Sequence, residues 1–323
     1  MRRAIWIVVS LASLGAVIWW ASRQHAPKMP TNASGAGWLA ASLGVYAVAL
    51  ALRGWRWHRI MRLAGIAHQR ADAFWLMLVA YMGNTVLPAR GGEVLRISIL
   101  GSRTSAKVRE VVGSVIAERV LDIATLAVIF AVLTWEGVAG SPTGTLAADL
   151  AAAALVAAAV LLVAYLALRR RGRFDSFATR VRPFAIASKL FIQPEGVPLA
   201  GVSGLIWVLE GLTLLFVGRS LGLHLTLLEA LLTNVIASLF SALPAGPGYA
   251  GSYDAGILLG LHASRVMGGD AVGFLLLARF VVFVPVTIVG LIVLVTRYGG
   301  LRRKRGGKGV HLQDQYAENL LRS

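Results

Sequence analysis

Long apolar runs separated by short polar segments make up most of the chain. Six of these runs come close to the roughly 20 apolar residues that cross a hydrocarbon core of about 30 Å. They lie at Ala4–Ser22, Gly37–Leu52, Val111–Trp135, Leu146–Leu168, Leu199–Val217 and Ala271–Thr296. The pattern therefore predicts an all-α, polytopic membrane protein with six full transmembrane helices.

Two further apolar regions, 73–100 and 227–263, are too long for one span and are interrupted by proline and glycine. Proline lacks the backbone donor that a helix needs, and glycine favours other backbone angles. We therefore expect two broken helical hairpins that enter the membrane and return on the same side. The break residues are Pro88, Gly91 and Gly92 in the first region and Pro244, Gly246, Pro247, Gly248 and Gly251 in the second.

The distribution of Lys and Arg predicts how the chain is oriented. Basic residues concentrate in segments 53–70, 103–109, 169–189 and 297–308, whereas 136–145 contains none. Because cytoplasmic loops are enriched in Lys and Arg, we expect both termini to be cytoplasmic. The first hairpin then starts and ends on the cytoplasmic side, and the second on the outer side.

The first apolar run admits two interpretations. Met1-Arg2-Arg3 followed by an apolar stretch resembles a cleaved secretory signal. Trp19-Trp20 at its far end resembles an interfacial aromatic belt and favours an uncleaved anchor.

The order of span, broken hairpin and long span occurs twice. The starts differ by 199 − 37 = 162 residues, the hairpin prolines by 244 − 88 = 156 and the ends by 296 − 135 = 161. The second copy has the opposite orientation, which is the inverted-repeat organisation of many transporters. The predicted units are an anchor and outer loop (1–36), repeat half 1 (37–136), a linking helix and basic cytoplasmic loop (137–198), repeat half 2 (199–296) and a basic cytoplasmic tail (297–323).

Composition and charge exclude several other classes. Apolar residues make up 57% of the 323 residues, which is more than a water-soluble enzyme uses. There is no cysteine, and the six histidines are scattered, so we expect no metal and no cofactor. The net charge of +17 is carried by the loop clusters, which suit topology and anionic lipid better than nucleic acid.

Several charged residues nevertheless fall at membrane depth, where each costs at least about 2.5–3.5 kcal/mol. They are Arg90, Glu93 and Arg96 around the first break, Glu118, Arg119 and Asp122 on the following span, and Asp254 and Arg279 in the second half. One interpretation is a closed salt-bridge network that holds the hairpin to the long helix. The other is a hydrated cavity that binds a phosphate, aided by the helix that starts after Gly91-Gly92. No nucleophile–base pair is visible, so we expect no catalytic residues and no enzyme activity.

A family resemblance rests on four ordered motifs. They are Leu87-Pro88-Ala89-Arg90-Gly91-Gly92-Glu93-Val94-Leu95-Arg96, Glu118-Arg119-Val120-Leu121-Asp122, Pro244-Ala245-Gly246-Pro247-Gly248-Tyr249-Ala250-Gly251 and Arg279. Together they resemble the transmembrane-region family of lysylphosphatidylglycerol synthase, a group of flippase-like integral membrane proteins. The resemblance implies a protein of the bacterial cytoplasmic (inner) membrane that moves or helps to handle an anionic phospholipid, a polyprenyl-phosphate-linked lipid or a hopanoid lipid.

The chain also departs from this family pattern. Residues 297–323 leave no room for the soluble aminoacyl-transferase domain of the bifunctional members, so we expect no lipid lysylation. A Glu that often follows the second glycine loop is replaced near that place by Asp254, whose role is therefore open. The leading expectation is a lipid flippase whose hairpins act as gates. The alternative is a non-catalytic scaffold for a separate lipid-modifying or glycosyl-transferring enzyme.

Overall fold

The computed structural model describes residues 29–87, 90–136, 194, 196–242 and 247–299. Several predicted features lie outside these ranges: the first helix, the linking helix, the basic loop and tail, and the break residues Pro88, Pro244 and Gly246.

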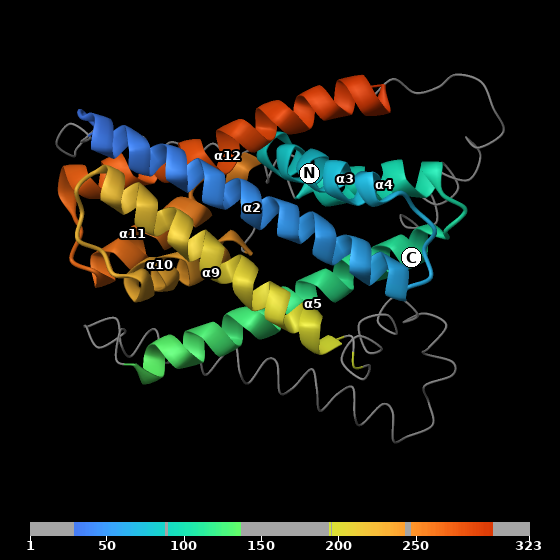
Figure 1. The fold of residues 1–323 in the computed structure, drawn as a ribbon, viewed down its shortest axis with the longest axis horizontal. Coiled ribbons are helices and arrows are strands. Elements are labelled where there is room, and N and C mark those ends of the chain that lie inside the picture. The colour runs from blue at the N-terminus through green and yellow to red at the C-terminus, as the bar shows by residue number, and fades with distance from the viewer. Residues whose placement is uncertain (1–28, 88–89, 137–193, 195, 243–246, 300–323) are drawn as a thin grey trace, which may run out of the picture.

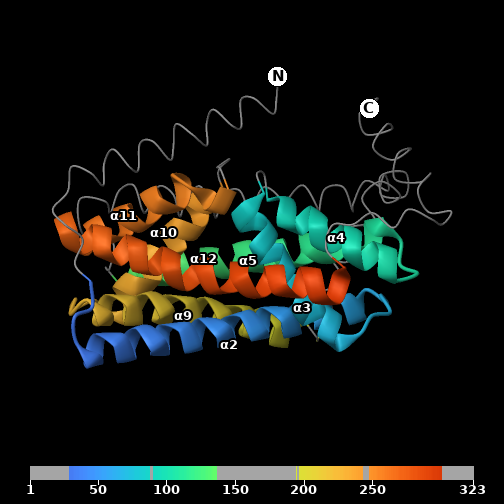
Figure 2. The same cartoon turned by 90° about the horizontal axis from the view of Figure 1, so that it is seen from above.

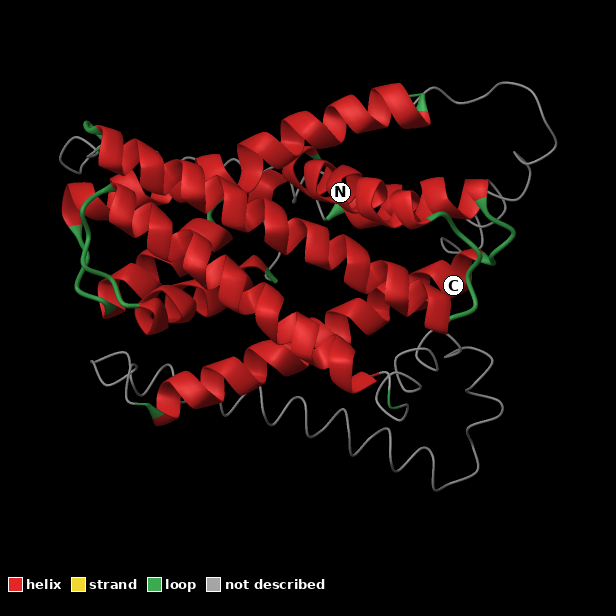
Figure 3. Ribbon diagram, viewed as in Figure 1, coloured by secondary structure: helices red, strands yellow, loops and turns green. Residues whose placement is uncertain are grey.

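The described residues form helices and contain no strand, which confirms the all-α prediction for this part of the chain (Figure 3). The first half comprises α2 (Ala33–Leu63), α3 (Arg70–Val86), α4 (Gly91–Arg103) and α5 (Val108–Trp135). The second half comprises α9 (Gly196–Ser220), α10 (Leu227–Ser241), the 3-10 turn η1 (Pro247–Tyr249), α11 (Ser252–Ala263) and α12 (Gly268–Tyr298).

Three helices, α2, α9 and α12, are long and apolar enough to cross a membrane. Helix α5 is also long, but Glu118, Arg119 and Asp122 interrupt its apolar run. The predicted span Gly37–Leu52 was too short at its C-terminal end, because α2 continues to Leu63. Arg53 and Arg56 therefore belong to a helix and not to the basic loop in which the charge pattern placed them.

Helices α2 and α9 pack against each other along the centre of the molecule (Figure 1). Helix α5 crosses this pair, and α12 packs against α3 (Figures 1 and 2). The largest apolar core lies among α2, α9, α10, α11 and α12, and it includes the fully buried side chains of Phe274 and Ile257. A second core surrounds Trp57 and the first hairpin.

Each predicted break joins two packed helices, α3 with α4 and α10 with α11. The two hairpins approach each other from opposite ends of the molecule (Figures 1 and 2). At about 1.5 Å per residue, the 17 residues of α3 and the 15 of α10 add up to about 48 Å, whereas the 31 residues of α2 or α12 extend about 46 Å. The hairpin tips therefore meet about halfway along the long helices.

Small residues allow the two helices of each hairpin to approach closely. A Cβ added to Gly92 would overlap the Ala80 carbonyl oxygen, and one added to Gly256 would lie 2.6 Å from the Ala237 Cα. Contacts of this kind, in which small residues bring helix backbones together, are common between membrane helices. They fix the position of the first turn of α4 and of α11, where the candidate site lies.

Local sequence explains several helix starts. The Asn32 side chain accepts a hydrogen bond from the Gly35 N–H and caps α2. Thr226 and Glu229 form a capping box at the start of α10. The Asp254 carboxylate accepts a hydrogen bond of 2.9 Å from the Gly251 N–H and caps α11.

Candidate functional site

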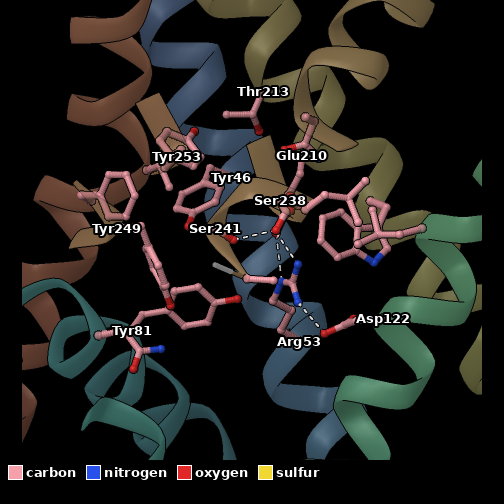
Figure 4. A pocket seen from close by; sticks show the side chains of 18 of the residues that line it. Tyr46, Arg53, Tyr81, Asp122, Glu210, Thr213, Ser238, Ser241, Tyr249 and Tyr253 are labelled. Atoms are coloured by element: carbon pink, nitrogen blue, oxygen red, sulfur yellow. Dashed lines mark hydrogen bonds and ion pairs between the residues drawn. The ribbon is translucent and has the colours of Figure 1, made fainter. Parts of the chain in front are cut away.

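A cavity of about 220 Å³ lies where the two hairpin tips meet the central helices (Figure 4). Its walls combine apolar side chains with hydroxyl, amide and charged groups from both halves. The polar and aromatic residues that line it are Tyr46, Arg53, Tyr81, Asn84, Thr85, Arg90, Arg119, Asp122, Trp207, Glu210, Thr213, Asn234, Ser238, Ser241, Tyr249, Tyr253 and Phe283.

Arg90 connects the two tips. Its backbone is left-handed (φ 56°), an unusual conformation for a residue other than glycine, and it immediately precedes α4. Its Nη2 donates a hydrogen bond of 3.1 Å to the Ser241 carbonyl oxygen at the end of α10. The guanidinium also lies over the Tyr249 ring, with 5.6 Å between Cζ and the ring centroid. A cation is thus fixed at the junction of the hairpins.

Arg53 occupies the centre of the cavity wall and links the two halves (Figure 4). Its Nε and Nη2 donate hydrogen bonds to the same Glu210 oxygen at 2.9 and 2.7 Å. Its Nη1 lies 3.5 Å from Asp122 Oδ2. The side chain is 4% exposed, so these partners compensate an otherwise costly buried charge.

A second group of charges lies behind the cavity wall. Glu118, whose side chain is fully buried, is 3.1 Å from Arg96 Nη1 and 3.8 Å from Arg56 Nη2. Arg56 Nη1 lies 2.8 Å from Asp122 Oδ1 and donates a hydrogen bond of 2.6 Å to Ser203 Oγ. This group is the closed network that holds the first hairpin and α2 to α5.

The remaining two arginines form equivalent pairs in the two halves. Arg119 on α5 is 3.0 Å from Glu93 in the first turn of α4, and Arg279 on α12 contacts Asp254 in the first turn of α11. The arginines are 279 − 119 = 160 residues apart and the carboxylates 254 − 93 = 161. Asp254 is thus the repeat counterpart of Glu93, which gives it a structural role.

Charge balance around the cavity singles out one group. Four arginines (Arg53, Arg56, Arg96 and Arg119) interact with four carboxylates (Glu93, Glu118, Asp122 and Glu210). Arg279 is matched by Asp254. In the part of the chain that the structure describes, Arg90 has a carbonyl and an aromatic ring as partners but no carboxylate. It is therefore the surplus cation of the site.

The structure separates the eight predicted binding residues into groups. Arg90, Arg119 and Asp122 line the cavity. Arg96 and Glu118 are fully buried behind its wall, and Glu93 is held by Arg119. Asp254 and Arg279 form a separate pair, with Arg279 Nη1 3.9 Å from the position of a Cβ on Gly248. Glu210 had been expected to pair with Arg219 or Arg279, but it pairs with Arg53.

The described break residues shape the tips. Gly91 and Gly92 begin α4, where the Gly92 N–H donates to Asn84 Oδ1 at 3.0 Å. Pro247 and Gly248 form η1, and Gly251 precedes α11; both glycines have positive φ, 63° and 86°. These conformations suit glycine, so the second tip depends on its sequence.

Arg53 and Arg56 are the main site residues that the charge pattern missed. Arginines near a helix end are usually counted as topology signals, and these two lie next to a basic loop. The repeat offset contained a usable signal: 210 − 53 = 157 residues separates Arg53 from Glu210, close to the 156 between the hairpin prolines. Among the described residues, no group of three or more potential metal ligands occurs.

Comparisons with known proteins agree with the motifs. The model of the family described as the lysylphosphatidylglycerol synthase TM region matches residues 5–290. A UPF0104 membrane protein of Methanothermobacter thermautotrophicus is 27% identical over 242 residues, which is 66% of this chain and 71% of that protein. The UPF0104 membrane protein MJ1078 of Methanocaldococcus jannaschii is 23% identical over 216 residues, which is 65% of this chain and 91% of that protein.

A third similarity is more limited. The protein named glycosyltransferase AglD of Haloferax volcanii is 28% identical over 144 residues, which is 40% of this chain and 23% of AglD. No solved structure shows a significant match to the chain.

Proposed function

The chain belongs to the lysylphosphatidylglycerol synthase transmembrane-region family, and from that premise we propose that it moves an anionic, phosphate-bearing lipid headgroup across the bilayer through the cavity between its hairpin tips. The lipid tails stay in the membrane while the headgroup passes the tips. We further propose that the hairpins re-enter the bilayer of the cell membrane from opposite faces.

The observation that carries this proposal is the position of Arg90. Its guanidinium lines the cavity, has no carboxylate partner among the described residues and contacts the opposite hairpin. A surplus cation between membrane helices is costly unless water or an anion reaches it. Arginine also matches the geometry of a phosphate group.

The two equivalent ion pairs suggest how each side could admit the headgroup. The Arg119 and Arg279 side chains are 33% and 28% exposed, far more than Arg96 or Arg56. Each pair joins a hairpin to a long helix, so its opening would free an arginine for a phosphate. Interrupted helices at matching positions of two inverted repeats mark the substrate site in many transporters.

The direct test is lipid movement in proteoliposomes that contain phosphatidylglycerol labelled on an acyl chain with a fluorophore. Dithionite bleaches only the outer leaflet, so transport appears as bleaching beyond that leaflet. We expect Arg90→Gln to reduce the rate at least about tenfold, because a charged hydrogen bond to phosphate is lost.

Arg265→Gln is the matched control. Arg265 also has a left-handed backbone (φ 58°), but it is exposed in the turn between α11 and α12, away from the cavity. It should transport at the wild-type rate. Equal rates for Arg90→Gln and wild type, at equal reconstitution, would refute the proposed role of Arg90.

A second candidate is a membrane scaffold for a separate glycosyl-transferring enzyme. It is favoured by the similarity to a segment of a much longer protein that is named a glycosyltransferase. This candidate predicts a co-purifying enzyme and no lipid movement by the isolated chain, so the same assay distinguishes the two.

A further inference from the structure

Two buried hydrogen-bond donors line the cavity without a partner in the protein. They are Nδ2 of Asn234 on α10 and Nε1 of Trp207 on α9. The residues are 7% and 6% exposed, respectively. Buried donors are normally satisfied, so two orphans in one cavity indicate a ligand that supplies acceptor oxygens.

The surrounding wall adds hydroxyl groups. Tyr46, Tyr81, Tyr249 and Tyr253 lie around the cavity in Figure 4, together with Ser238. A hydroxyl can both donate and accept a hydrogen bond, so it suits a ligand whose own hydroxyls do the same.

The carboxylates of the described lining are already engaged. Asp122 is within 3.5 Å of Arg53, Arg56 and Arg119, and Glu210 is 2.7 Å from Arg53. A headgroup ammonium would therefore have to displace an arginine to find a counter-ion. The lining favours hydroxyls over amines on this ground.

The charge of the lining also indicates the charge of the ligand. Three arginines (Arg53, Arg90 and Arg119) face two carboxylates (Asp122 and Glu210), so the balance is 3 − 2 = 1 positive charge. A phosphodiester carries one negative charge and would neutralise it.

We propose that the cavity selects phosphodiester headgroups that end in hydroxyls, such as glycerol or a sugar, over those that end in an amine; this inference rests on the transport function proposed above. The phosphate contacts Arg90 at the junction of the hairpin tips. The hydroxyls of the headgroup accept hydrogen bonds from Asn234 and Trp207 on the second-half side.

The test compares two acyl-labelled lipids in the proteoliposome assay, phosphatidylglycerol and phosphatidylethanolamine. Both have one phosphodiester group, but one ends in hydroxyls and the other in an ammonium group. We expect the wild-type protein to move phosphatidylglycerol at least about tenfold faster, a difference that one or two hydrogen bonds can supply. Equal rates would overturn the selectivity and leave the transport function standing, whereas no movement of either lipid would overturn both.

Variants locate the selectivity. Trp207→Phe keeps the ring but removes the donor, and Asn234→Leu removes the amide. Each should slow phosphatidylglycerol about fivefold, as expected for one hydrogen bond, without slowing phosphatidylethanolamine. Trp38→Phe is the matched control, because Trp38 on α2 is 39% exposed and stacks on Phe216 outside the cavity.

Two further outcomes would overturn the inference. One is an unchanged lipid preference in Trp207→Phe and Asn234→Leu proteins that unfold at the wild-type temperature in detergent. The other concerns a soluble source of the same chemistry: glycerol 3-phosphate in large excess should leave lipid movement unchanged, and a complete block would reassign the cavity to the soluble compound.

Discussion

Single residues decide where charge can be tolerated inside this protein. Glu118, Arg119 and Asp122 could be recognised from the sequence as charges that need partners, because they interrupt an apolar run. Their partners could not be identified in the same way. Arg96 was close in the pattern, but Arg53 and Arg56 come from a helix end that also has the composition of a cytoplasmic loop.

The closed part of the network gives a stability prediction. Replacing Glu118 by Gln leaves Arg96 and Arg56 buried without this carboxylate, and breaking a buried ion pair on one side costs about 3–5 kcal/mol. We expect a loss of about that size in the free energy of unfolding, measured by denaturation in detergent micelles.

Glu136→Gln is the control for this prediction. Glu136 is exposed just beyond the end of α5, so its replacement should change the free energy of unfolding by less than about 0.5 kcal/mol. If Glu118→Gln were as stable as the wild-type protein, the carboxylate would not have the structural role assigned to it.

At the scale of helices, much of the organisation follows from proline, glycine and the length of apolar runs. The bounds 227–263 predicted for the second hairpin coincide with those of α10 and α11, because turn residues flank both helices. The end of α2 was not predictable from hydropathy, since the last two turns of that helix contain four arginines and are supported by ion pairs. How closely the hairpin helices pack depends on glycines such as Gly92, which the sequence marks as a break but not as a contact.

The proposed opposite entry of the hairpins predicts opposite labelling of two equivalent turns. Ser105 lies between α4 and α5, Met267 lies between α11 and α12, and both are exposed. Because the chain contains no cysteine, Ser105→Cys and Met267→Cys each introduce one thiol. A membrane-impermeant maleimide added to intact cells should label Met267→Cys, and should label Ser105→Cys only after permeabilisation. Labelling of both from the same side would contradict the inverted arrangement.

On the scale of the whole molecule, the two halves meet around one polar centre. Arg53 and Glu210 occupy equivalent positions of the repeat and pair with each other, so their contact lies where the halves are related. The hairpin tips meet beside this pair, through Arg90 and Ser241. Sequence landmarks predicted that there are two halves, but the cavity depends on side chains from eight helical elements and could only be found in three dimensions.

The central claim is that the hairpin tips meet at the cavity and must separate for a headgroup to pass. A Cβ added to Gly248 lies 3.7 Å from Thr85 Cγ2, so cysteines at both positions should form a disulfide across the tips. The most direct measurement is lipid movement by Thr85→Cys/Gly248→Cys proteoliposomes before and after reduction, with each single variant as control. The account predicts that the oxidised double variant is blocked and that reduction restores transport to the level of the single variants. Full transport by the cross-linked protein would contradict it.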